Sequence, residues 1–235
     1  MNETGQAMAP PWSQVGKRCS LLQRRADMGP EAFRAHWAQP HAEIARRVPG
    51  IRRYTQNRVE RTLWADGGGH APYACDGIVE LEFLSEPAMA EANASAAVLQ
   101  ELPADEPHFL RGITLCRVPV GARQTWPGQR KVMLALHHAQ GVTGLAARVG
   151  EALGALPLLE HSVDPVHSSF HREALHHEVP APQLFATLWF APGADLAALL
   201  GPGSAWAAAM SGLGVHGAAW LCDPLPIVQE GPCNS

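Results

Sequence analysis

Residues 33–57 read FRAHWAQPHAEIARRVPGIRRYTQN, and this stretch combines an apolar helical stripe with two histidines, a tryptophan and a tyrosine. The apolar residues that recur at helical spacing are Phe33, Trp37, Ile44 and Val48. His41 occupies the gap that another apolar residue would fill. A titratable ring on a core-facing stripe needs either a function or a satisfied place in the core, so His41 is the first candidate functional residue.

The residues on either side of this stretch predict one βαββαβ unit. Pro49 and Gly50 end the helix, and residues 77–83 alternate apolar with charged residues, as a half-buried strand does. The expected elements are a strand at 18–23, a helix from about 30 to 47, strands at 51–59 and 77–83, a helix from 86 to about 99 and a strand at 112–118. Two helices would then cover one face of an antiparallel sheet, which is an α+β arrangement.

The second half of the chain predicts the same order of elements more faintly. Aligning Pro157 with Pro49 gives an offset of 108 residues and brings the helices and the second strands of the two halves together. An internal duplication is the simplest account, and two such units could pair their sheets face to face. The expected organisation is an N-terminal arm at 1–15, a first unit at 16–120, a linker at 121–129, a second unit at 130–228 and a C-terminal tail at 229–235.

Composition excludes several classes of partner. At 235 residues and 46% apolar content, the chain can bury a proper core. Its 18 basic residues against 22 acidic ones give no field that would attract nucleic acid, and no run of about 18 apolar residues predicts a membrane span. The five cysteines are scattered and odd in number, which argues against a disulfide framework and a zinc site. We expect a soluble, unprocessed protein of the reducing cytoplasm.

A set of residues in fixed order connects the first half to a known family. The set is Phe33, His36-Trp37, His41-Ala42, Pro49-Gly50, Tyr54, Asn57, Asp76-Gly77-Ile78, Asp105-Glu106 and Phe109. In this order and spacing, over about residues 16–120, it resembles the EthD family of the dimeric α+β barrel superfamily. The resemblance implies ferredoxin-like βαββαβ units and a barrel that two chains normally make, here made by the two halves of one chain as a pseudo-dimer.

The same resemblance implies a small-molecule pocket between helices and sheet that works without metal or organic cofactor. Relatives in the superfamily include polyketide cyclases, decarboxylases of aromatic polyketides, methylmuconolactone methylisomerase and cofactor-free monooxygenases. A small hydrophobic or aromatic substrate is therefore expected. The fused halves could act as a monomeric pseudo-dimer or assemble further as a homo-oligomer.

The polar residues of the first half are missing from the second. At the offset of 108 residues, Trp37 aligns with Leu145, His41 with Val149, Tyr54 with Ser162 and Asn57 with Pro165. Residues needed only for folding should persist in a copy that forms the same helix-on-sheet contact, so their loss favours a function in the first half. The alternative is drift, because a unit freed from dimer symmetry can refill core positions with aliphatic residues.

The residue types suggest acid/base chemistry. An imidazole titrates near neutrality and can accept a proton in an apolar cleft, so His41 could act as a general base. Tyr54 could donate a hydrogen bond to the oxyanion that develops. We expect Trp37 to form an aromatic wall and His36 to lie at the rim. Alternatively, His41 is a buried histidine satisfied by the backbone carbonyl of His36, which Pro40 frees.

Further substrate contacts are expected at Phe33, Asn57 and Asp105, although a solvated turn would explain Asp105 equally well. Three functions stay open. The first is a cofactor-independent enzyme that works by general acid/base chemistry as a cyclase, isomerase or decarboxylase. The second is an oxidoreductase, either a cofactor-free monooxygenase or its accessory protein, and the third is a non-catalytic small-molecule binding protein.

Two clusters of charged or titratable residues give weaker evidence for a function. The arginines between Arg46 and Arg61 could bind an anionic substrate or form a solvated face. His167 and His171 stand four residues apart, which on a helix would suit one metal ion. Prolines bound their segment on both sides, however, and predict a long solvated connection rather than a metal site.

Overall fold

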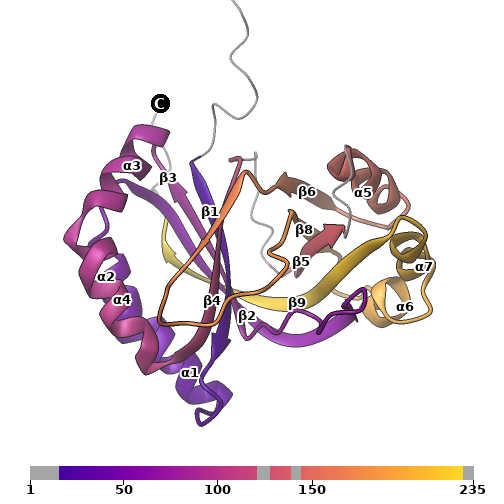
Figure 1. Cartoon of the computed structure of the whole chain (residues 1–235). Coiled ribbons are helices and arrows are strands. Elements are labelled where there is room, and N and C mark those ends of the chain that lie inside the picture. Colours follow the sequence, from indigo (N-terminus) through magenta and orange to yellow (C-terminus); the bar gives the residue numbers. More distant parts are fainter. Residues whose placement is uncertain (1–15, 121–127, 139–143, 230–235) are drawn as a thin grey trace, which may run out of the picture.

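The computed structural model describes residues 16–120, 128–138 and 144–229 of the chain. The predicted arm, most of the linker and nearly all of the tail fall outside these ranges. The fold is α+β, as predicted, with helices packed around one strongly curled antiparallel sheet (Figure 1). Among the described residues, no helix combines the length and the apolar character that crossing a membrane requires.

The first unit has the strand order β2-β3-β1-β4, which is ferredoxin-like. Its strands are β1 (Lys17–Arg24), β2 (Ile51–Asp66), β3 (Gly77–Phe83) and β4 (Leu110–Val118). Its first helical segment comprises α1 (Pro30–His36), a π-helical turn (Trp37–His41) and α2 (Ala42–Ala45). Its second comprises α3 (Glu86–Ala94), a π-helical turn (Ala97–Glu101), α4 (Leu102–Asp105) and a 3₁₀ turn (Glu106–His108).

The second unit has the corresponding order β6-β8-β5-β9. Its elements are β5 (Arg130–His138), α5 (Leu145–Leu153), β6 (Glu160–Pro165), β7 (Ser168–His171), β8 (Leu184–Phe190), α6 (Leu196–Leu200), α7 (Ala205–Gly212) and β9 (Val215–Val228). The two halves therefore share one connectivity. Their origin by duplication stays a prediction.

Two seams join the units into a closed sheet. At the first seam, β2 and β9 pair antiparallel over most of their length. At the second, the chain between residues 160 and 171 changes partner: the Val166 amide donates to the carbonyl of Gln183 beside β8, and the next amide, of His167, donates to the carbonyl of Arg117 on β4. Because β6 pairs with β8 and β7 pairs with β4, this segment connects the two ends of the sheet.

The segment that carries His167 and His171 was predicted to be a solvated connection, and this prediction is corrected for the residues that form β7. The stretch is polar because much of its length faces solvent while its backbone closes the barrel. No group of three potential metal ligands is found among the described residues. His171 instead stacks on His177, with ring centroids 4.2 Å apart.

Four buried charged side chains form an ionic cluster in the interior of the barrel. Lys17 Nζ lies 2.9 Å from Glu80 Oε1 and 3.2 Å from Asp164 Oδ2, and Lys131 Nζ pairs with the second oxygen of Glu80. Lys17 and Glu80 belong to the first unit, whereas Lys131 and Asp164 belong to the second. Because burial is costly for an unpaired charge, this ionic cluster favours one alignment of the two units.

Replacing Glu80, the carboxylate that the two lysines share, should therefore lower the stability of the protein. In Glu80→Gln, Lys17 keeps its pair with Asp164 but Lys131 loses its pair with Glu80, and we expect the free energy of unfolding to fall by about 3–5 kcal/mol. Urea denaturation monitored by tryptophan fluorescence measures this change. Glu91→Gln, on the exposed face of α3, is the matched control and should leave stability nearly unchanged. A loss in Glu80→Gln no larger than in the control would contradict the role of the cluster.

Candidate functional site

The first helical segment carries His41 to the edge of the core through a π-helical turn. Pro40 lies inside this turn and has no amide hydrogen to donate, so the helix widens instead of ending. Phe33, Trp37 and His41 all remain on the buried side, and the chain continues into α2. The proline that was predicted to disturb the helix thus helps to position His41.

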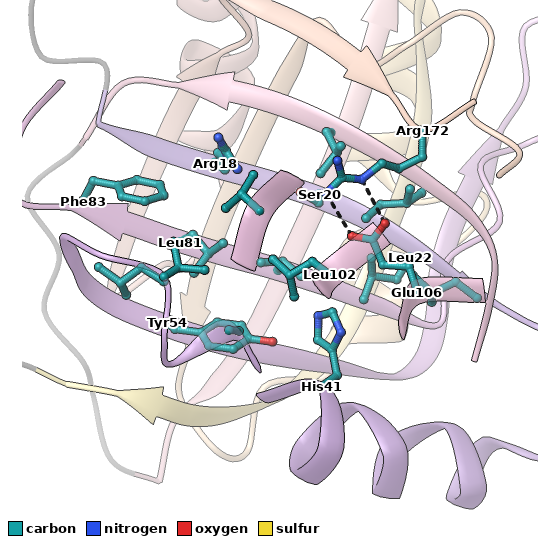
Figure 2. A pocket seen from close by; sticks show the side chains of 18 residues that line it. Arg18, Ser20, Leu22, His41, Tyr54, Leu81, Phe83, Leu102, Glu106 and Arg172 are labelled. Atoms are coloured by element: carbon teal, nitrogen blue, oxygen red, sulfur yellow. Dashed lines mark hydrogen bonds and ion pairs between the residues drawn. The ribbon is translucent and has the colours of Figure 1, made fainter. Parts of the chain in front are cut away.

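A pocket lies between this helical segment, the second helical segment and the outer face of β1, β2, β3 and β4. Its empty space, counted out to the open mouth and including the solvent there, is about 600 Å³. Apolar side chains form most of the lining, among them Leu22, Leu81 and Leu102 (Figure 2). His41 and Tyr54 contribute polar atoms, and Figure 2 shows the Tyr54 hydroxyl pointing toward the His41 ring.

His41 is held by a carboxylate. Its Nδ1 lies 2.9 Å from Asp105 Oδ2, and Nε2 of His36 lies 2.9 Å from the other oxygen, Oδ1. Burial alone would raise the pKa of Asp105, but the hydrogen bonds from His41 and His36 outweigh it and lower the pKa below its ordinary value. The carboxylate can only accept hydrogen bonds, so the ring nitrogen facing it carries the proton. In neutral His41 this leaves the lone pair on Nε2.

Tyr54 is kept as a hydrogen-bond donor. Gln56 Nε2 donates to the Tyr54 hydroxyl at 2.8 Å and to the backbone carbonyl of Trp37 at 2.7 Å. Burial raises the pKa of Tyr54 well above its usual value, so its proton stays in place at neutral pH. Because the hydroxyl already accepts from Gln56, its own proton can be directed to another acceptor. Gln56 was missed by sequence reasoning, although strand periodicity places it on the same face as Tyr54.

None of the five predicted substrate contacts, including His36 and Asp105, lines this pocket. Trp37 and Phe33 are almost fully buried and pack on each other with centroids 5.5 Å apart, so they support the site from the core instead of forming its wall. Asn57 projects to the opposite face of the sheet, where it donates to Glu80 in the barrel. The physical reason is strand periodicity: Tyr54 and Asn57 are three residues apart and face opposite ways.

His36 and Asp105 act behind His41. The two histidine rings flank Phe109, with centroids 4.8 Å from it for His36 and 4.9 Å for His41. His36 is also stacked near His108, at 6.5 Å, toward the outside of the helix. Asp105 is thus a positioning group for both imidazoles. The catalytic roles of His41 and Tyr54 stay predictions.

The charged part of the pocket was not predicted. Arg18 from β1 and Arg172 from the second unit both line it, and Arg172 pairs with Glu106 at 2.9 Å (Figure 2). The cluster between Arg46 and Arg61 does not contribute to the lining. Three of its members pair with acids elsewhere: Arg47 with Glu101, Arg53 with Glu82 and Arg58 with Asp223. No local signal connects Arg172 to this site, because its place depends on the closure of the barrel.

The comparisons with known proteins agree with this architecture. Residues 25–112 match the model of the EthD domain, which confirms the predicted resemblance for that segment. No curated protein matches the chain. Among solved structures, an anthrone oxidase-like protein aligns over 97% of this chain and 99% of its own with 10% sequence identity and a TM-score of 0.62. That likeness supports the fold of both halves together.

Two further solved structures cover most of the chain with lower scores. A protein assigned as a monooxygenase from Lactobacillus acidophilus NCFM covers 92% of this chain and 95% of its own, with 9% identity and a TM-score of 0.40. A protein assigned as a chlorite dismutase covers 91% of this chain and 96% of its own, with 11% identity and a TM-score of 0.45.

The hydrogen bonds to Asp105 predict opposite tautomers for the two histidines. In their neutral forms, His41 should carry its proton on Nδ1 and His36 on Nε2, because each presents that nitrogen to the carboxylate. Two-dimensional ¹H–¹⁵N NMR of the imidazole rings distinguishes the tautomers. Asp105→Asn, whose amide has only one accepting oxygen, should abolish the wild-type tautomer of at least one ring, Nδ1–H in His41 or Nε2–H in His36. A wild-type His41 with its proton on Nε2 would contradict the geometry.

Proposed function

We propose that the pocket is the active site of a cofactor-independent enzyme that acts on a small aromatic, polyketide or lactone substrate by general acid/base catalysis. The observation that carries the proposal is His41 at the wall of an apolar pocket, with Asp105 behind its Nδ1 and the Tyr54 hydroxyl pointing toward it. A base, the group that orients it and a hydrogen-bond donor are the parts that proton abstraction next to a carbonyl requires.

The proposed first step is removal of a proton from the carbon next to a carbonyl. The proton passes to Nε2 of His41, and the electron pair of the broken C–H bond moves onto the carbonyl oxygen as an enolate. Asp105 stabilises the imidazolium that forms, and Tyr54 donates a hydrogen bond to the enolate oxygen. The apolar lining lowers the local polarity, which strengthens both interactions.

The second step depends on the substrate. Return of the proton from His41 to a different carbon gives an isomer. Attack of the enolate carbon on a second carbonyl forms a ring instead, and the alkoxide that results takes the proton back from His41. Both outcomes use the same two residues and need no external electron acceptor. The second unit is proposed to be a scaffold, because the position that aligns with His41 holds Val149, which is fully buried in an apolar core.

The proposal is tested by deuterium exchange from heavy water into the acidic C–H position of a panel of aromatic polyketide ketones and unsaturated lactones, followed by NMR. Wild-type protein should accelerate exchange in at least one class of compound. His41→Gln should lower that rate by about 10²- to 10⁴-fold. His161→Gln, at an exposed position on β6, is the matched control and should exchange at the wild-type rate.

Two outcomes would contradict the proposed role of His41. One is full exchange activity in His41→Gln. The other is tight binding of panel compounds to wild-type protein without any exchange, which would identify a non-catalytic small-molecule binding protein.

Cofactor-free oxygenation is the second candidate, because the solved structure with a TM-score of 0.62 is described as anthrone oxidase-like. The same proton removal would generate a carbanion whose electron pair passes to O₂. The product is a hydroperoxide with a new C–O bond that takes the proton back from His41, so O₂ would be the co-substrate. An oxygen electrode separates the two chemistries. Stoichiometric oxygen uptake during turnover would assign an oxygenase, and turnover without uptake would assign an isomerase or cyclase.

A further inference from the structure

Arg18 is a buried cation on the pocket side of β1. Neighbouring residues Lys17 and Cys19 face the barrel interior, so the alternation of the strand directs Arg18 outward under the helices. It retains 7% of its accessible surface. Figure 2 places it with Phe83 on the side of the pocket away from His41.

The partners of Arg18 leave its charge uncompensated. One terminal nitrogen, Nη2, donates to the side-chain carbonyl of Asn93, which is neutral. The guanidinium carbon lies 5.5 Å from the ring centroids of both Phe83 and Phe170. Its Nε is buried without a hydrogen-bond partner, and across the described residues no carboxylate lies within ion-pair distance of it. A buried cation with an unused donor is costly unless a ligand completes it.

The charged residues around Arg18 do not neutralise it either. Arg117 is directly opposite Arg18 on β4 and pairs with Glu86 at 3.4 Å, while Arg172 pairs with Glu106 at 2.9 Å. These two arginines therefore have their own acids. Burial, then Arg172 and Arg117, lower the pKa of Arg18 to about 10, so that Arg18 is still charged at neutral pH. Among the described residues, the charge of Arg18 therefore has no acid to neutralise it and is available to bind a ligand.

We propose that Arg18 binds a carboxylate of the substrate and so restricts the proposed enzyme to small aromatic or cyclic acids. A carboxylate fits better than a phosphate ester, because one uncompensated charge matches a monoanion and the rest of the lining is largely apolar. The inference rests on the proposed function in one respect: it takes this pocket as the substrate site.

Binding at Arg18 would orient the substrate. The carboxylate lies at Arg18, the ring rests on the apolar floor that includes Leu22 and Leu81, and the carbonyl reaches Tyr54 and His41. This orientation argues against decarboxylation of that carboxylate. Loss of CO₂ would leave its electron pair at the Arg18 end, away from the Tyr54 hydroxyl, and the ion pair would stabilise the ground state.

The test compares 2-naphthoate with its neutral isostere 2-naphthamide by isothermal titration calorimetry. Wild-type protein should bind the acid about 10- to 100-fold more tightly than the amide, as expected for a charge-assisted hydrogen bond. Arg18→Met should lose this preference and keep its affinity for the amide, and Arg18→Lys should restore part of it. Arg61→Met, an exposed arginine of β2, is the matched control and should keep the full preference.

Equal binding of acid and amide to wild-type protein would overturn the inference, even if Arg18→Met fails to fold. So would a crystal structure of the wild-type complex in which the naphthoate carboxylate lies away from the guanidinium. The titration needs no turnover, so its result is independent of the exchange assay. If the protein prefers the acid but catalyses no proton exchange, only the proposed catalysis is contradicted. If it catalyses exchange but shows no preference for the acid, only the role of Arg18 is contradicted.

Discussion

The ionic cluster inside the barrel is the constraint on which the rest of the structure depends. Each buried charge needs a partner, and Lys17 and Glu80 pair both with each other and with Asp164 and Lys131 of the other unit. The two sheets are thereby aligned so that the segment after β6 can pair with β4. Arg172 follows directly on β7, and this closure brings it over the pocket of the first unit. The site therefore belongs to one unit but is completed by both.

The helices of the two units bury different kinds of residue, although the two units share one connectivity. In the second unit, residues such as Leu145 and Val149 pack in a continuous apolar cluster. In the first unit, the π-helical turn presents His41 beside a cavity, and Asp105 compensates for the polarity of the ring. A buried imidazole held by a carboxylate takes the place of an apolar side chain that would pack better. Such a residue is expected where function, and not stability, determines the residue type.

Much of the architecture could be predicted from the sequence because local patterns carry it. The strand at 77–83 has the predicted bounds, since its alternation of apolar and charged residues is clearly delimited. The position of His41 followed from helical spacing. Contacts between distant segments could not be predicted: Lys17 and Asp164 are 147 residues apart. Arg18 was overlooked because an arginine on a strand has no local mark that distinguishes a pocket from a solvated surface.

The central claim is that His41 itself moves the substrate proton. Single-turnover transfer of deuterium tests it most directly, with a substrate labelled on the carbon next to its carbonyl and product analysed by mass spectrometry in ordinary water. A single base shielded by an apolar pocket predicts that part of the label reappears in the product, at a rate that collapses in His41→Gln. Label transfer at the wild-type rate in that variant would contradict the account.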